Sequence, residues 1–366
     1  MSTEMLLAAI VFIATYALIS LRRLPRIKVT TWQAALIGAL LMLLIGAVAI
    51  DDLDEYVNTD IILLLLGMML LVASLDACGF FNLTAKLLIK GSRDGRTLLA
   101  VVMVVSAVLS ALVLNDVVVL LMTPAVIRCC RKTDADPIPY LVAVFISANI
   151  GSVATVIGNP QNAYIATSAG IDFLTFSQYM VPLSVLCLML SYLLLLALYG
   201  KRLDLGSPLP VPEAVGYDRR IYPVTAIMLA MVIMFALSHA LDIPLWSIAM
   251  VGGLASFVIV ATMGRNVPLK VARRIDWGVL LFFIGLFVVM GGAVETGLLD
   301  EFTSHFPGFR DGTPSIGALT VVTAVLSNLT PGVVAIAAAP RSSSSDDSSS
   351  SSSSSSSSEG SYASAS

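Results

Sequence analysis

Residues 97–127 read TLLAVVMVVSAVLSALVLNDVVVLLMTPAVI, an apolar stretch that carries Asn115 and Asp116 near its middle. Basic residues flank the stretch on both sides, and they are Lys86, Lys90, Arg93 and Arg96 before it and Arg128, Arg131 and Lys132 after it. In membrane proteins, Lys and Arg in short loops stay on the cytoplasmic side. A segment with both ends on that side must enter the membrane and return, so we predict a re-entrant hairpin.

The predicted turn of this hairpin places an amide and a carboxylate inside the bilayer. Backbone that is not helical is tolerated at that depth only where it is buried in protein or lines a watery cavity. An ionisable residue in such a place indicates a functional site. The turn at Asn115 and Asp116 therefore predicts a transport site. The alternative is one long, tilted helix, which would put the later basic clusters on the opposite side of the membrane.

The composition indicates an all-α polytopic membrane protein. Of 366 residues, 57% are hydrophobic and only 12% are charged, whereas a soluble domain has about 25% charged residues. The net charge of −3 is too small to suggest nucleic acid as a partner. The four cysteines and two histidines show no metal-ligand spacing, so no metal site is expected. No Gly-x-x-x-x-Gly-Lys loop is present, and we expect neither an ATP-driven pump nor an enzyme.

About 20 apolar residues are needed to span the hydrocarbon. The candidate spans are 5–21, 33–50, 60–80, 140–167, 178–199, 221–241, 244–262 and 277–296. With the hairpin included, every basic cluster falls inside, and the acidic loop 51–55 falls outside. We therefore expect a multi-pass protein of the cell membrane with its N-terminus outside.

The sequence also contains signs of an internal repeat. Gly67 and Gly79 bracket one apolar helix, and Gly285 and Gly297 bracket another, offset by 218 residues. The Ala-Val-Leu-Ser run at 107–110 recurs at an offset of 217. Short matches of this kind can arise by chance, but in the predicted topology the two copies run in opposite directions. Inverted repeats are typical of secondary transporters, whose binding site lies at mid-membrane between broken helices.

The second copy is predicted to be incomplete. At the same offset, Gly332 and Val333 stand where Asn115 and Asp116 stand in the first copy, and residues 348–358 are all serine. Polar low-complexity sequence cannot fold into a packed core. We interpret the tail as a reading-frame accident that truncates the second repeat; a genuine disordered tail is the alternative.

The predicted organisation has six parts. They are N-terminal transmembrane helices at 1–59, a first transport repeat at 60–200, a cytoplasmic loop at 201–220, linking transmembrane helices at 221–276, an incomplete second repeat at 277–340 and a disordered Ser-rich tail at 341–366.

A second polar constellation follows the hairpin, at 147–162. Gly158, Asn159 and Pro160 break a helix there, because proline removes a donor and glycine permits unusual backbone angles. Carbonyl groups freed by a break suit Na⁺, whereas the N-termini of half-helices suit an anion. Asp116 could hold a cation, or carry a proton if burial raises its pKa.

The residues that we predict to bind the substrate or the coupling ion lie in these two constellations. They are Asn115, Asp116, Thr123, Asn149, Gly151, Ser152, Thr155, Gly158, Asn159 and Asn162. Serines in membrane helices often only bond neighbouring helices, which is the simpler interpretation of Ser147 or Ser152 taken alone. Cys129 and Cys130 could bind a soft metalloid such as arsenite, although reduced cytoplasmic cysteines without a role are the commoner case.

The two constellations resemble the paired motifs of the ion transporter superfamily. The matching residues are Leu114-Asn115-Asp116-Val117-Val118-Val119 with Thr123-Pro124, and Ala148-Asn149-Ile150-Gly151-Ser152 with Gly158-Asn159-Pro160-Gln161-Asn162. They look most similar to arsenite/antimonite permeases and citrate-transporter-like members, over about residues 60–329. The resemblance implies inverted repeats, each with a re-entrant hairpin and a broken helix, often in a homodimer that moves its substrate domain as an elevator.

One departure from the family pattern narrows the expected function. The sodium–dicarboxylate branch has Ser-Asn-Thr where this chain has Leu114-Asn115-Asp116, which favours the permease-like or cation/proton antiporter branches. We expect a secondary-active transporter of a small ion, an anion or oxyanion of arsenite or carboxylate type, with Na⁺ or H⁺ as coupling ion and no other cofactor. A Na⁺/H⁺ antiporter and a non-functional truncated remnant are the alternatives.

Overall fold

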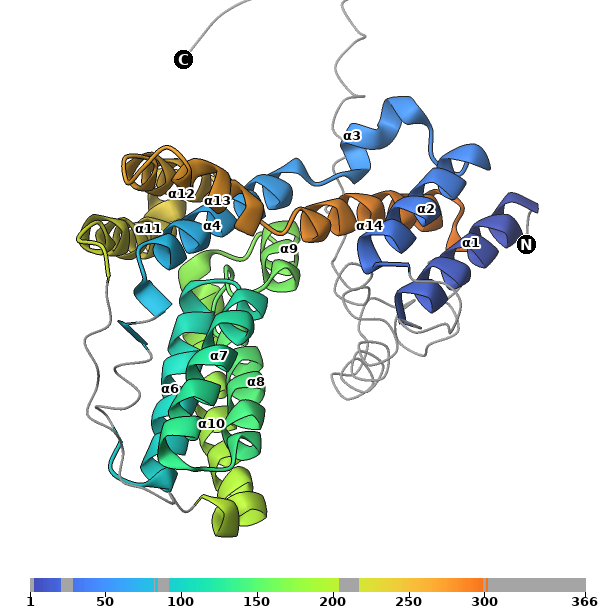
Figure 1. Cartoon of the computed structure of the whole chain (residues 1–366). Coiled ribbons are helices and arrows are strands. Elements are labelled where there is room, and N and C mark those ends of the chain that lie inside the picture. The colour runs from blue at the N-terminus through green and yellow to red at the C-terminus, as the bar shows by residue number, and fades with distance from the viewer. Residues whose placement is uncertain are drawn as a thin grey trace, which may run out of the picture.

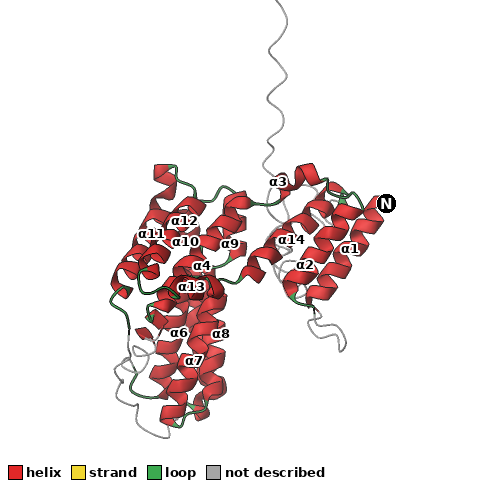
Figure 2. Cartoon of the chain, turned by 45° about the horizontal axis from the view of Figure 1, so that its top comes forward, coloured by secondary structure: helices red, strands yellow, loops and turns green. Residues whose placement is uncertain are grey.

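The computed structural model describes residues 3–20, 29–81, 83–84, 92–203, 217–298 and 301, and its regular elements in these ranges are all helices (Figures 1 and 2). The elements are α1 (Thr3–Ser20), α2 (Thr31–Leu44), η1 (Ile50–Asp52), α3 (Leu53–Tyr56), α4 (Thr59–Ala77), α6 (Gly95–Leu112), α7 (Asn115–Thr133), α8 (Pro137–Val153), α9 (Pro160–Ser168), α10 (Phe173–Tyr199), η2 (Gly200–Arg202), α11 (Ile221–Leu241), α12 (Leu245–Ala261), α13 (Val267–Arg274) and α14 (Trp277–Glu295).

The surface of these helices is that of a membrane protein. Within the described residues, six helical stretches are long and apolar enough to cross a membrane. Helix α10 shows the pattern most clearly, because only Phe173, Ser184 and Leu195 of its 27 residues are buried and the rest are largely Leu, Met, Val and Tyr. A helix that is apolar all round belongs in lipid or in a large core. The predicted all-α polytopic fold is confirmed.

The helices form three groups (Figure 1). Helices α1, α2 and α14 pack together at one side, and α4, α11 and α12 form a second layer with α13. Helices α6, α7, α8 and α10 form a bundle that meets this layer at one end. Helix α9 lies at the junction, where the ring of its Tyr164 is 5.7 Å from that of Phe287 on α14. Stacked rings of Phe173 and Phe235 join α10 to α11.

The chain reverses direction between α6 and α7. Val113 and Leu114 have extended backbone angles and interrupt the helix. At the far end of the bundle, the Tyr140 hydroxyl at the start of α8 donates to the carbonyl of Gly95, the first residue of α6. Only three residues connect the end of α7 to α8, so α6 begins at the end of the bundle where α7 finishes. The alternative of one continuous helix is therefore wrong, and entry of the hairpin into a membrane stays a prediction.

The reversal gathers basic residues at one end of the bundle. Arg93 and Arg96 adjoin the start of α6, and Arg131 lies in the last turn of α7. Arg202, after α10, reaches Asp136 before α8, with 3.8 Å between guanidinium and carboxylate. Three clusters predicted to share one side of the membrane thus share one end of the fold, and the side itself stays a prediction.

Several predicted helix boundaries were wrong for local reasons. The span predicted at 33–50 ends at Leu44, because Gly46 takes a φ of +73° and the chain turns there. Helix α10 begins at Phe173 rather than 178, since the Asp172 carboxylate accepts a hydrogen bond from the Thr175 amide and caps the helix. The short helix α13 was not predicted at all.

Glycine packing is the same in the two halves of the predicted repeat. A Cβ added to Gly67 of α4 would collide with the backbone of Ala249 on α12. A Cβ added to Gly285 of α14 would likewise collide with the backbone of Ala35 on α2. Each helix of the proposed pair thus packs glycine to backbone against a neighbouring helix.

The ends of α4 and α14 also match. Gly79 and Gly297 have φ of +86° and +72°. The amide of each donates to a carbonyl three residues earlier, and its carbonyl accepts from an amide four residues later. These correspondences support an inverted repeat, which stays a prediction because the segment predicted to form the second hairpin lies outside the described residues, as does the Ser-rich tail.

Candidate functional site

The turn of the hairpin meets the break between α8 and α9. The backbone amide of Asn115 donates to the carbonyl of Gly158 over 3.3 Å. The hydroxyl of Thr155 donates to the carbonyl of Ala111 at the end of α6 over 2.6 Å. The two polar constellations of the sequence are therefore in direct contact.

The predicted helix break is confirmed. Helix α8 ends at Val153 and α9 begins at Pro160, with Asn159 in an extended conformation as the N-cap. The Asn159 side-chain oxygen accepts a hydrogen bond of 2.8 Å from the Asn162 amide. Such a cap satisfies one of the amides that the first turn of a helix leaves without a partner.

The side-chain amides of Asn159 and Asn162 serve the end of α8. The Asn162 Nδ2 lies 3.1 Å from the carbonyl oxygen of Ser152 and 2.9 Å from that of Thr155. The Asn159 Nδ2 lies 3.3 Å from the Ser152 hydroxyl. The carbonyls freed by the break are thus partly satisfied within the protein. Each carbonyl retains a second lone pair that an ion can use.

Two predicted site glycines have packing roles. A Cβ at Gly158 would collide with the backbone of Ser152, so glycine allows the tight return of the chain before α9. A Cβ at Gly151 would collide with the backbone of Ala107, so Gly151 sets the close approach of α8 to α6. Gly158 shapes the junction itself, and Gly151 supports it from one turn below.

Two other predicted residues lie apart from the contacts at the junction. Asn149 donates over 2.8 Å to the Phe145 carbonyl within its own helix. Thr123 lies about two turns along α7 from Asn115. The structure thus brings together Asn115, Ser152, Thr155, Gly158, Asn159 and Asn162. Sequence reasoning missed Ser110, whose hydroxyl bonds the Ala148 carbonyl over 2.6 Å and joins α6 to α8 just below the turn.

Asp116 lies on the first turn of α7 and is exposed to a cavity of about 730 Å³. The cavity separates α4 from α7, and the corner between α13 and α14 closes one end of it. Asp76 of α4 forms an ion pair there with Arg274 of α13. The sequence did not indicate this ion pair, because α13 was not predicted.

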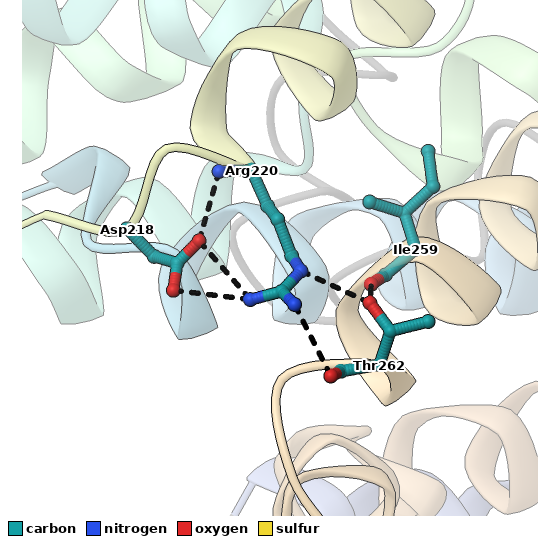
Figure 3. Close-up of polar contacts among 4 residues, drawn as sticks. All are labelled: Asp218, Arg220, Ile259 and Thr262. Atoms are coloured by element: carbon teal, nitrogen blue, oxygen red, sulfur yellow. Dashed lines mark hydrogen bonds and ion pairs between the residues drawn. The ribbon is translucent and has the colours of Figure 1, made fainter.

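Arg220 joins the ends of several helices (Figure 3). Its guanidinium donates to the Thr262 hydroxyl over 3.0 Å and to the Thr262 carbonyl over 3.2 Å, and it pairs with Asp218 at 3.3 Å. The Asp218 amide in turn bonds the Cys78 carbonyl over 3.1 Å. These contacts hold the ends of α4 and α12 to the start of α11. The sequence identified Arg220 only as part of a basic loop.

Comparison with known proteins places the chain in a family. A family model described as citrate transporter, CitMHS, matches residues 16–352. An uncharacterized transporter of Mycobacterium tuberculosis is 29% identical over 330 residues, which cover 87% of this chain and 73% of the relative.

Two relatives with more specific names match shorter stretches. A silicon efflux transporter of Oryza sativa subsp. japonica is 35% identical over 52% of this chain and 40% of its own length. A putative transporter, arsB, of Dictyostelium discoideum is 34% identical over 46% of this chain and 30% of its own length. The expected resemblance is confirmed: this multi-pass membrane transporter belongs to the citrate transporter family, within the ion transporter superfamily.

Proposed function

We propose that the protein is a secondary-active transporter of a small anion or oxyanion, of arsenite or carboxylate type, coupled to Na⁺ or H⁺. The observation that carries the proposal is the contact between the hairpin turn and the broken helix, through Asn115 and Gly158. Each of these two segments is non-helical at this point, and they come from different parts of the chain. Broken helices that meet in this way form the binding sites of secondary transporters.

The orientation of the helix ends supports an anionic substrate. Helix α7 begins at Asn115 and α9 begins at Pro160, so two N-termini lie at the junction. The N-terminus of a helix carries a partial positive charge and favours anions. The C-terminus of α8, which ends at Val153, lies at the same junction and offers carbonyl oxygens to a cation. The junction thus contains helix ends of both partial charges. The N-termini suit an anionic substrate, and the C-terminus suits a coupling cation.

Asp116 is our candidate for the coupling group, because its carboxylate follows the turn directly and faces the cavity. One relative is named a silicon efflux transporter, which supports a small inorganic substrate. We further infer that the protein lies in the cell membrane with its N-terminus outside, and that it works as a homodimer.

The test is transport by the full chain reconstituted in liposomes. Radiolabelled arsenite and citrate are offered with an inward Na⁺ gradient, an inward pH gradient or neither. We expect one solute to accumulate at least tenfold more with one of the gradients. In Asp116→Asn the same solute should still equilibrate, and the gradient should no longer drive accumulation, because the amide cannot be ionised.

Two results would contradict the proposal. The first is an absence of movement of both solutes under either gradient in protein that is monodisperse and helical. The second is unchanged gradient dependence in Asp116→Asn, which would remove Asp116 from the coupling mechanism. A Na⁺-driven change of internal pH without any solute would instead support the Na⁺/H⁺ antiporter.

A further inference from the structure

The cavity that Asp116 faces is amphipathic. Its long walls are apolar and are formed by α4 and α7, whereas the corner between α13 and α14 is charged. The apolar lining residues are Met69, Val72, Ala73, Val117, Leu120, Leu121, Ile275 and Trp277. Leu120 is 71% exposed, so the rest of the described protein does not cover this part of the wall formed by α7.

The acids at the charged corner have partners within the protein. Asp76 pairs with Arg274. The Asp276 carboxylate caps α14 by accepting a hydrogen bond of 3.2 Å from the Val279 amide. Arg273 lines the cavity beside them, and none of the ion pairs found within the described residues uses it.

Two basic side chains of α13 are exposed beside the cavity. They are Arg273 and Lys270, and the ion pair found at this corner within the described ranges uses Arg274 instead. The opposite face of α13 is anchored by Val271, which is completely buried. The helix therefore lies against the protein with two cations available on its outer side.

Trp277 is the first residue of α14 and lies at this corner of the cavity. Its ring is half-exposed, and its indole nitrogen donates over 3.1 Å to the Ala272 carbonyl on α13. Tryptophans with an apolar ring and a bonded N–H are enriched at the boundary between lipid and water. Trp277 lines the cavity together with Arg273 and the apolar walls.

We propose that this cavity holds an acyl chain of an anionic phospholipid, whose phosphate lies between Lys270 and Arg273. An apolar space that opens to a bilayer is filled by lipid tails, and basic residues at the surface select anionic headgroups. A lipid bound there would lie between α4 and α7, next to the carboxylate of Asp116. The proposal concerns a lipid site and does not depend on which solute is transported.

Trp277 provides a direct reporter of this lipid. The chain has three tryptophans, so Trp32→Phe with Trp246→Phe leaves Trp277 as the only one. The full chain is reconstituted in phosphatidylcholine that contains a fixed fraction of lipid with brominated chains, which quench nearby tryptophan. We expect brominated phosphatidylglycerol to quench at least twofold more strongly than brominated phosphatidylcholine, because the anionic lipid is enriched at the site.

Adding Lys270→Gln and Arg273→Gln to this protein should bring the ratio of the two quenching constants close to one. The matched control is Arg131→Gln with Lys201→Gln, which removes the same charge at exposed positions at the far end of the bundle and should leave the ratio unchanged. A second control keeps Trp246 alone. Trp246 lines a separate cavity with Asp60, Asp172 and Asp242, and no Lys or Arg is among its described lining residues, so its ratio should be near one.

Equal quenching of Trp277 by the two brominated lipids would overturn the proposal without any charge variant. A preference that survives in Lys270→Gln/Arg273→Gln would also overturn it, since the headgroup would then be held elsewhere. A loss of preference in the Arg131→Gln/Lys201→Gln control would do the same, because it would reduce the effect to net charge.

Discussion

Two places where helices meet in this protein are built in opposite ways. Helices α4 and α12 run past each other, and Gly67 and Gly253 let their backbones touch, with each glycine lying against the backbone of the other helix. At the junction of α6, α8 and α9 the helices end, and polar side chains fill the contact. Asn162 and Thr155 each bond carbonyl groups there.

The difference follows from the state of the backbone. A continuous helix in lipid satisfies its own amides and carbonyls, so close packing of small residues suffices. A broken helix leaves carbonyls that cost several kcal/mol each if they find no partner. Polar side chains must then supply partners, and the same groups are available to a ligand. Architecture and function thus use different residues, and each can be disturbed separately.

The largest effect is expected at the glycine contact. Gly67→Val places two methyl groups against the backbone of Ala249, where even a Cβ has no room. Overpacking costs about 1–3 kcal/mol when neighbours can shift, and backbone cannot shift as a side chain does. We expect loss of monodisperse protein in size-exclusion chromatography.

The matched control for Gly67 is Gly200→Ala, because a Cβ at Gly200 meets nothing within contact distance and its backbone is already helical. Wild-type behaviour of Gly67→Val would mean that α4 and α12 do not pack as described.

The next effect concerns function at the junction. Asn162→Ala removes the hydrogen bonds of 3.1 and 2.9 Å to the carbonyls of Ser152 and Thr155, and each lost bond costs about 0.5–1.5 kcal/mol. We expect transport in liposomes to fall at least tenfold, with a lower melting temperature. Asn149→Ala is the control, because the one hydrogen bond found for its side-chain amide within the described residues goes to Phe145 in its own helix. Equal losses in both variants would contradict the distinction between them.

Much of the fold could be predicted from the sequence. Apolar length located the helices, and the basic residues around 97–127 predicted a reversal that the break at Val113 and Leu114 shows. The helix boundaries were harder to predict, because they depend on single residues such as Gly46 and Asp172. Helix α13 has only eight residues and is rich in basic side chains, so it gave no signal of apolar length.

The sequence predicted which residues belong to the candidate site better than it predicted the hydrogen bonds that they form. Polar residues inside apolar sequence pointed to Asn115, Thr155 and Asn162, which do meet. The sequence could not show that the Asn162 amide faces the end of α8, because that depends on where the chain turns after Val153. Nor could it pair Asp76 with Arg274, which are far apart in sequence and meet only through packing.

A smaller effect should separate the two parts of the junction. Thr155→Val keeps the shape of the side chain and removes the only hydrogen bond found, within the described residues, from this hydroxyl to the end of α6. The expected loss is about 0.5–1.5 kcal/mol, seen as a modest fall in melting temperature. Ser147→Ala is the control, since its hydroxyl bonds Ala143 in its own helix. A larger fall in the control would contradict a special role for the contact between helices.

The smallest effect is expected at Asp94, at the end of the bundle remote from the junction. Its carboxylate accepts hydrogen bonds from the Thr97 hydroxyl and amide, over 2.5 and 2.7 Å, and these bonds lower the pKa of the Asp94 carboxyl. Because the folded protein has the lower pKa, the stabilisation is fully present above the unfolded pKa of about 4 and is lost as pH falls through the folded value. Asp94→Asn should therefore melt slightly below wild type at pH 7, and the gap should close below about pH 4.

Transport by Asp94→Asn at pH 7 should equal that of wild type, because the cap holds the start of α6 and touches none of the residues that meet at the hairpin turn. A gap in melting temperature that persists at low pH would mean that the charge of Asp94 does not matter. A change in transport without a change in stability would mean that the basic end of the bundle is coupled to the junction, and the separation between structural and functional contacts drawn above would fail at that end.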